Sequence, residues 1–438
     1  MKMEAHPVGA QEAVGELTAP GRFPVIQEVP NPLANRYLAR QPILDAHGKV
    51  HGYELLFRAG REASFRGDGV HATQNILDQT VVFGLDVLTN GHTAFVNCTR
   101  EAILEEQVRV LPPDRTVLEL LETLEPDAQL LTACQRLHRS GYRFALDDFT
   151  WSNAWQPFLP LVDYIKVDIE QMDVIARMEL QATLRIHHCP AAWIAERVET
   201  EEDFQQLRRE GFGLFQGYFF SRPAIVENRA IPTNRMLHLE LLRSLLEDPL
   251  DQNKLSDLVK RDPSLMLRLF RLVNSPLYGM RNEIHSIRMA LQLVGDAVFR
   301  RMATLAVASE MLGDQPSELL QMAFHRARFC EIAATQRGLD AAEQYMLGML
   351  SLVPALLHTS ADIVVNHLPL RQPIRLALMG AKNPERGSLC WIECYEHGEW
   401  ARCDALAEQL GISSEQMAAL YLESLQWARE NMPLEVQE

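Results

Sequence analysis

Polar and acidic residues stand at or near the end of nearly every strand-like segment in the first half of the chain. They are Gln41, Glu54, Asn97, Glu119, Asp147, Asp148, Lys166, Glu196 and Gln216. In a barrel of alternating strands and helices, side chains at the carboxyl ends of the strands converge on one mouth. Carboxylates gathered there repel one another and are costly to bury unless a cation accompanies them. Their hard oxygen atoms favour Mg²⁺ or Mn²⁺ over zinc.

Each of these residues has an ordinary explanation when it is taken alone. A single Glu at a strand end is usually a solvated loop residue, the pair Asp147-Asp148 could cap a helix, and Lys166 could be a surface charge. The joint pattern favours a metal site, because nearly every strand would have to deliver a compatible ligand by chance.

The strand-like segments alternate with helical patterns, which is typical of a largely parallel α/β barrel. The predicted strands are Tyr37–Leu44, Gly52–Phe57, Thr93–Cys98, Thr116–Leu121, Arg143–Phe149, Tyr164–Ile169, Ala192–Val198 and Gly213–Phe219. The helical patterns include Asn75–Leu88, Asp127–Ser140 and Glu201–Glu210. The short turn Asp45–Gly48 predicts an antiparallel hairpin for the first two strands. We therefore expect a TIM-like α/β barrel with an antiparallel first strand.

The second half of the chain has a different pattern, because the strand signal stops after Pro223. Helical spacing begins at Asn234, and Gly295 and Gly411 are typical of helix ends. We expect an all-α domain there. The expected divisions are a flexible N-terminal arm over residues 1–35, the barrel over 36–223, a linker over 224–236 and the helical domain over 237–432.

Composition and charge narrow the classes of partner and compartment. The chain has 438 residues and a formal net charge of -16, so polymeric nucleic acid and membrane surfaces are not expected partners. Its 7 cysteines are scattered, which favours a reducing cytoplasm over a disulfide framework. Met1–Gln11 lacks the apolar stretch of a signal peptide. The apolar run Tyr345–Leu357 is too short to span a membrane and is predicted to be a buried helix.

One cysteine-rich segment invites a metal hypothesis. Cys390, Cys394 and His397 could share a helical face, with Cys403 nearby. The tight Cys-x-x-Cys pairs of structural zinc sites are missing, so we expect these residues to be structural. The same interpretation applies to His187-His188, which no acid or cysteine framework surrounds.

A series of short motifs runs along the barrel half in a fixed order. They are Gln41-Pro42-Ile43, Tyr53-Glu54-Leu55-Leu56-Phe57-Arg58, Phe95-Val96-Asn97, Leu118-Glu119-Leu120, Ala145-Leu146-Asp147-Asp148-Phe149, Ile165-Lys166-Val167-Asp168, Ala195-Glu196-Arg197-Val198-Glu199-Thr200, Gln216-Gly217-Tyr218-Phe219 and Phe220-Ser221-Arg222-Pro223. Their order and spacing resemble those of bacterial EAL domains over residues 36–223, with Leu55 in place of the signature alanine.

The resemblance implies metal-dependent hydrolysis of cyclic-di-GMP to linear pGpG, with one or two Mg²⁺ or Mn²⁺ ions as cofactor. By position, the implied ligands of the first metal are Glu54, Asn97, Glu119 and Asp147. Asp148 would serve the second metal. Such ions lower the pKa of a bound water and clamp the phosphoryl oxygens.

The remaining roles also follow from the resemblance. Lys166 and Glu196, together with Asp148, would be catalytic, because the first two position or activate the attacking water. Lys166 would add positive charge where negative charge develops. The implied substrate contacts are Gln41, Arg58 and Gln216, and Gln216 would also complete the metal or water shell.

The segment after the paired aspartates departs from the family. EAL enzymes carry a Gly-Thr-Gly loop there, which holds the second metal, contacts the residue at the Glu199 position and supports dimerisation. This chain instead reads Phe149–Gln156, and Trp151 cannot easily adopt the conformations that glycine permits. Arg197 also replaces a small glycine. These changes suit either a slow enzyme or a binding protein, and a homodimer is compatible with the resemblance.

A second group of motifs lies in the helical half. Asp262-Pro263-Ser264, Leu272–Gly279 and Ile284–Ile287 resemble the signature of HDOD domains, with a match over residues 237–427. HDOD domains lack the His-Asp metal pair of HD phosphohydrolases, and here Ser351 and Leu352 occupy that position. The resemblance implies a regulatory domain without catalysis that engages a protein partner.

Three hypotheses follow from these patterns. The first is an active cyclic-di-GMP phosphodiesterase, and the second is a catalytically silent effector or scaffold that acts through its helical domain. The third is another metal-dependent barrel enzyme with an enolate or phosphate substrate. The third ranks last, because it explains neither the motif Gln216-Gly217-Tyr218 nor the fused helical domain.

Overall fold

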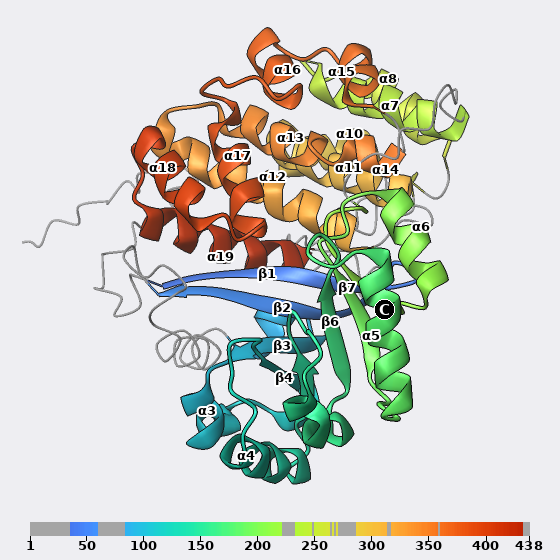
Figure 1. The fold of residues 1–438 in the computed structure, drawn as a ribbon. Coiled ribbons are helices and arrows are strands. Elements are labelled where there is room, and N and C mark those ends of the chain that lie inside the picture. The colour runs from blue at the N-terminus through green and yellow to red at the C-terminus, as the bar shows by residue number, and fades with distance from the viewer. Residues whose placement is uncertain are drawn as a thin grey trace, which may run out of the picture. The chain divides into compact units, whose positions relative to one another are not determined.

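A computed structural model describes residues 36–59, 84–220, 233–247, 249–262, 265, 266, 269, 286–312, 317–357 and 360–431. Eight strands close into a barrel in sequence order (Figure 1). They are β1 (Arg36–Asp45), β2 (Val50–Ala59), β3 (Thr93–Cys98), β4 (Thr116–Leu120), β5 (Arg143–Leu146), β6 (Tyr164–Asp168), β7 (Ala192–Glu196) and β8 (Leu214–Gln216). Every predicted strand is confirmed, although β5, β7 and β8 end two or three residues earlier than expected.

The barrel interior is built in two layers, because alternate side chains of a strand point to the same face. A buried apolar layer forms the floor and contains Ile43, Phe95, Val117, Ala145, Tyr164, Ile194 and Leu214. β2 contributes Gly52 to this level, where an added Cβ would lie 2.8 Å from the Phe95 ring. The positions two residues further along the parallel strands β3 to β8 are Asn97, Glu119, Asp147, Lys166, Glu196 and Gln216. The sequence pattern thus places a polar layer directly above a buried apolar layer.

The first strand runs against its neighbours, which confirms the predicted hairpin. β1 pairs antiparallel with β2 and β8, whereas the remaining neighbours pair in parallel. Because β1 is reversed, Gln41 comes two residues before the floor residue Ile43 and lies opposite Glu54 of β2. The barrel is therefore mixed, and its polar layer still includes a residue from β1.

Short helices connect the strands. They are α2 (Leu85–Thr89), α3 (Arg100–Leu104), α4 (Ala128–Arg139), α5 (Val174–Ile186) and α6 (Glu201–Glu210), with 3-10 turns η1 (Gln107–Val110), η2 (Pro113–Arg115) and η3 (Asn153–Leu161). The side chains of Asp127, Asp173 and Thr200 accept hydrogen bonds from the first turns of α4, α5 and α6, which fixes where these helices begin. The predicted helices Asp127–Ser140 and Glu201–Glu210 are confirmed.

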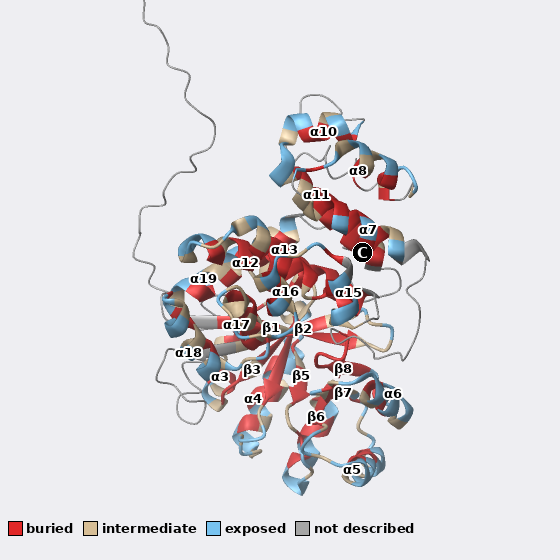
Figure 2. Cartoon of the chain, turned by 90° about the horizontal axis from the view of Figure 1, so that it is seen from above, coloured by how far each residue is buried: buried red, intermediate tan, exposed pale blue. Residues whose placement is uncertain are grey.

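The rest of the described chain is helical. Its helices are α7 (Thr233–Leu246), α8 (Gln252–Val259), α10 (Ile287–Val294), α11 (Asp296–Leu312), α12 (Ser317–Arg337), α13 (Ala341–Leu350), α14 (Val353–Leu357), α15 (Ala361–His367), α16 (Gln372–Leu378), α17 (Arg386–Glu396), α18 (Trp400–Leu410) and α19 (Ser414–Asn431). Gly295 and Gly411 follow α10 and α18 with positive φ, which confirms the predicted helix ends. Figure 2 shows that much of α11, α12 and α13 is buried.

The apolar run Tyr345–Leu357 is buried at the residues 345–350 and 352–356, as expected, but it is not one helix. It is divided between α13 and α14, with Ser351 and Leu352 between them. Pro354 is the second residue of α14, where its missing N–H is tolerated. Within the described residues, no helix combines the length and the apolar character that a membrane span requires.

Several predictions fall outside the described residues. They concern the arm over residues 1–35, most of the linker 224–236, most of the helix Asn75–Leu88, the motif Leu272–Gly279 and the side chain of Arg58.

Helix α12 is central to the helical region, because it packs against α13, α17 and α19. His325 of α12 is buried, and its Nε2 donates to the carbonyl oxygen of Tyr421, 3.1 Å away. Burial and then the charge of Arg40 lower the pKa of His325 to about 3. An unfolded histidine takes up a proton near pH 6.5, whereas this one stays neutral in the folded protein over several pH units.

Acidification should therefore destabilise the protein through His325. Between about pH 6.5 and about pH 3 only the unfolded state gains this proton, so stability falls as the pH is lowered. We expect wild type to lose about 2 kcal/mol more than His325→Gln between about pH 7.5 and about pH 5. Urea unfolding at both pH values measures this, and equal losses in the two proteins would contradict it.

Candidate active site

A single lysine stands at the centre of the polar layer. The Nζ atom of Lys166 lies 3.0 Å from Glu54, 2.9 Å from Glu119, 2.7 Å from Asp147 and 2.9 Å from Glu196. The lysine side chain is 1% exposed, and the acids around it are largely buried. The structure thus brings together carboxylates from β2, from β4, from the residue that follows β5 and from β7.

Glu54 is held by three donors from three other strands. Its Oε1 accepts from the Asn97 amide at 2.9 Å, and its Oε2 accepts from Lys166 at 3.0 Å and from the Gln216 amide at 2.6 Å. Gln216 also donates to Gln41 Oε1 at 2.9 Å. These contacts link β1, β2, β3, β6 and β8 around one carboxylate, so Glu54 has a fixed position.

The charges in this layer are not balanced. Burial raises the pKa of Asp147 to about 6 and that of Glu196 to about 8, against the opposing charge of Lys166. Burial and then the charge of Glu54 raise the pKa of Glu119 well above its ordinary value. Burial would also raise the pKa of Glu54, but Lys166 and the hydrogen bonds outweigh it and lower this pKa. One ammonium therefore does not satisfy the acids around it.

The donor set fits a hard divalent cation. Both carboxylate oxygens of Glu119 and the Oε1 of Gln216 are buried without a hydrogen-bond partner. The close approach of Lys166 to Glu119 is an ion pair and lacks the geometry of a hydrogen bond. Within the described part of the chain, no His, Cys, Asp and Glu side chains are spaced to hold an ion as they stand. The acids close around the ammonium instead, and their oxygen atoms are of the type that Mg²⁺ and Mn²⁺ prefer.

Beside the lysine cluster lies a second acidic pair. Burial and then the charge of Asp168 raise the pKa of Asp148, which shares a hydrogen bond with Glu196. Asp168 ends β6 and lies opposite Glu196. Arg197 places its Nε 3.2 Å from Asp168. Asp168 had no predicted role, although its place at a strand end two residues after Lys166 was a usable signal.

Backbone geometry explains part of the departure from the family at Arg197. Its φ is 57°, in the left-handed region that glycine occupies most readily. The arginine holds this conformation while its side chain bridges Asp168 and Glu170. Asp148 also has a positive φ of 44°.

The segment after Asp148 is packed with aromatic side chains. Trp155 contacts the rings of Phe149 and Phe158, with centroids 6.2 and 5.1 Å away. Trp151 stacks on His187 at 4.8 Å, so His187 has a structural contact, as expected. Glu199 is half-buried in the turn between β7 and α6.

The candidate residues of the helical region make structural contacts. The Ser351 hydroxyl donates to Gly348, and Leu352 is buried. Cys390 and Cys394 hydrogen-bond to each other, which lowers the pKa of Cys390 to about 6. His397 instead stacks on Tyr218 of the barrel at 3.7 Å.

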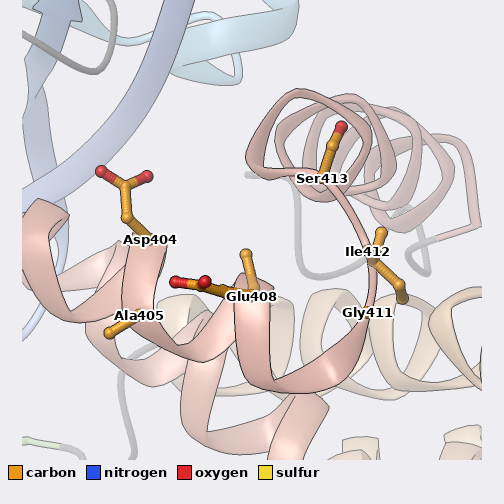
Figure 3. Close-up of a pocket in the computed structure, with 7 residues that line it drawn as sticks. Asp404, Ala405, Glu408, Gly411, Ile412 and Ser413 are labelled. Carbon is orange, nitrogen blue, oxygen red and sulfur yellow. The ribbon is translucent and has the colours of Figure 1, made fainter.

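A cavity of about 520 Å³ is lined by α18 and by the turn of residues 411–413 that leads to α19 (Figure 3). Its lining includes the carboxylates of Asp404 and Glu408 and none of the strand-end residues. An acidic lining disfavours a phosphorylated ligand, so this cavity is not a candidate for the nucleotide chemistry.

Comparisons with known proteins agree with the two-part organisation. The chain matches the models of an EAL domain over residues 88–223 and of an HDOD domain over residues 231–370. It is 34% identical over 399 residues to the cyclic di-GMP phosphodiesterase CdgJ of Vibrio cholerae, covering 90% of this chain and 92% of that protein. It is 30% identical over 408 residues to the uncharacterized protein YuxH of Bacillus subtilis, covering 90% and 98%. A solved EAL domain protein of Listeria monocytogenes has a TM-score of 0.35 and 22% identity over 44% of this chain and 89% of that one.

Removal of the central ammonium should destabilise the protein, because the acids around it then lack a positive charge. Lys166→Met leaves the buried acids without their shared partner, so we expect a loss of about 3–5 kcal/mol in metal-free buffer. Added Mn²⁺ should restore more stability to this variant than to wild type. Lys254→Met, which removes a partly exposed ion pair with Glu247, should cost less than about 1 kcal/mol. Thermal unfolding with and without Mn²⁺ measures these changes, and equal losses in the two variants would contradict the account.

Proposed function

Because the chain belongs to the EAL–HDOD family of bacterial signalling proteins, we propose that its barrel hydrolyses cyclic-di-GMP to linear pGpG with a bound divalent ion. The observation that carries this proposal is the cluster around Lys166, in which four carboxylates from separate strands meet one ammonium. The similarity to a named cyclic di-GMP phosphodiesterase over 90% of this chain supports the choice of substrate.

The residues proposed to hold the metal are the oxygen donors around the lysine. They are Glu54, Asn97, Glu119 and Asp147, with Asp148 toward a second ion. We propose Mg²⁺ or Mn²⁺, because every one of these ligands is a carboxylate or an amide oxygen. When bound, such an ion lowers the pKa of water and neutralises phosphoryl oxygens.

The chain's own residues supply positioning and proton transfer. Burial alone would lower the pKa of Lys166, but the surrounding acids outweigh it and raise this pKa, so the ammonium would face the negative charge that develops on the phosphate. Glu196, whose carboxylate lies 2.9 Å from Lys166, would take a proton from the attacking water. Gln41, Gln216 and Arg58 would contact the nucleotide.

The proposed domain limits follow the fold. We assign the arm to residues 1–35, an EAL-type TIM-like barrel to 36–223, the linker to 224–236 and the HDOD domain to 237–432. The closure of the barrel by β1 and β2 supports a start before residue 88, where the EAL model begins. The HDOD domain would regulate the barrel and bind a protein partner. All seven cysteines are free, which supports a cytoplasmic protein.

A second candidate function is binding of cyclic-di-GMP without turnover. The aromatic packing of residues 149–158 favours it, because this segment replaces the flexible glycine loop that the family uses to hold the second metal. Arg197 adds to this, since its guanidinium pairs with Asp168 beside Asp148.

The barrel also carries a surface suited to a homodimer. Ile175, Met178 and Ile186 on α5 are 69%, 58% and 74% exposed, and their spacing places them along one side of the helix. An exposed apolar stripe of this kind is typical of an interaction site. We propose that it packs against a second copy of the chain.

Hydrolysis and binding should be measured on the same preparation. We expect wild type with Mn²⁺ to convert cyclic-di-GMP to pGpG, and Glu54→Gln to reduce the rate by at least about a hundredfold. Glu240→Gln, at an exposed position on α7, is the matched control and should retain full activity. Binding without product, seen by calorimetry and chromatography, would establish the second candidate instead. Neither binding nor product would exclude both.

The dimer proposal predicts a change in mass. Met178→Glu places a charge in the α5 stripe and should convert a dimer to a monomer. Met379→Glu, at a 50% exposed position on α16, should leave the mass unchanged. Light scattering after gel filtration measures this, and a monomeric wild type would rule the dimer out.

A further inference from the structure

A buried polar cluster joins the outer face of the β1–β2 hairpin to the first turn of α12. Arg40 and Tyr53 come one residue before Gln41 and Glu54, so their side chains point away from the polar layer. Glu318 and Gln321 of α12 meet them there. All four members of this outer cluster are at most 8% exposed.

The outer cluster is hydrogen-bonded throughout. The Tyr53 hydroxyl donates to Glu318, whose other oxygen lies 3.7 Å from Arg40. The Gln321 amide, oriented with its oxygen toward Arg40, accepts at 2.8 Å and donates to Glu318 at 3.1 Å. Arg40 also lies over the Tyr53 ring, 4.3 Å from its centroid, and donates to the carbonyl of Leu88 at 3.0 Å.

The same helix reaches a second strand of the site. Arg326 of α12 pairs with Glu396 at 2.6 Å, and the Glu396 carbonyl accepts from the Tyr218 hydroxyl at 2.5 Å. Tyr218 follows Gln216 by two residues. Between them, Gly217 has φ 146°, and an added Cβ would lie 2.1 Å from the Val198 carbonyl oxygen. The backbone there has little room to move.

The two connections converge inside the barrel. The strand that carries Tyr53 presents Glu54, and the strand that leads to Tyr218 presents Gln216. The side chains of Glu54 and Gln216 are hydrogen-bonded at 2.6 Å. A shift of α12 would therefore be transmitted to both partners of this bond.

Stability alone is a weak reason for such a cluster, because a buried ion pair often contributes no more than apolar side chains of the same volume. Its directional bonds do fix the relative position of α12 and β2. A strand residue displaced on the outer face also displaces its neighbour on the inner face, because the two share one backbone.

We propose that Glu318 is a positioning residue, which holds Tyr53 and thereby sets the position of the Glu54 carboxylate. Through this bond the helical domain adjusts the metal layer of the barrel without contacting the substrate. The expected effect on metal affinity rests on the proposed function. The positioning of β2 by Glu318 does not.

The test uses the full-length chain and two readouts. In metal-free buffer, hydrogen exchange of the Tyr53–Leu55 amides should be about fivefold faster in Glu318→Ala than in wild type, because a buried hydrogen bond is lost. Glu318→Gln keeps an acceptor for Tyr53 and should restore most of the protection.

Calorimetry should show a Kd for Mn²⁺ that is about fivefold higher in Glu318→Ala and in Tyr53→Phe than in wild type. The double variant Tyr53→Phe, Glu318→Ala should bind Mn²⁺ no more weakly than the single variant of lower affinity. Both substitutions remove the same hydrogen bond, so their effects should not add.

Tyr142→Phe is the matched control. It removes a buried tyrosine hydroxyl that donates to Leu111 at 2.6 Å, away from the helical domain. It should leave β2 exchange and Mn²⁺ affinity unchanged. If Glu318→Ala alters β2 exchange no more than Tyr142→Phe does, the inference is overturned. If β2 exchange rises as expected but wild type binds no Mn²⁺, the positioning role stands and the proposed function fails.

Discussion

The barrel must bury one ammonium among four carboxylates. Lys166 is fully buried, and every acid around it comes from a different strand or strand end. Such a cluster is stable only if the strands keep their register and the barrel interior beneath the cluster excludes water. The closed barrel provides the register, and the apolar layer from Ile43 to Leu214 provides the dry floor.

The imbalance of charge connects this constraint to function. A group of acids with raised pKa values has an affinity for any cation that can enter, and the oxygen donors select a hard one. Lys166 and a metal ion would then together neutralise the negative charge of these carboxylates. The segment after Asp148 stands beside this layer with Trp155 packed between Phe149 and Phe158, and we propose that it decides between hydrolysis and binding.

The site could be predicted from local sequence because its signal is local. Strands show a period of two, and a polar residue two positions beyond an apolar one marks the step from floor to mouth. Polar residues at or near the ends of strand-like segments predicted Asn97, Glu119, Lys166 and Glu196, and the structure brings these four together. The contacts of Tyr53 and Tyr218 with the helical domain had no such signal. Tyr53 and Glu318 are separated by 265 residues, and each resembles an ordinary core or helix-cap residue in its own segment.

The cation site around Lys166 is measured most directly by the number of Mn²⁺ ions bound per chain, determined by electron paramagnetic resonance of free Mn²⁺ during titration. We expect one or two bound ions, displaced by excess Mg²⁺, and a loss of at least one of them in Asp147→Asn. A full-length wild-type protein that leaves all the Mn²⁺ free, or an Asp147→Asn variant that binds as many ions as wild type, would contradict it.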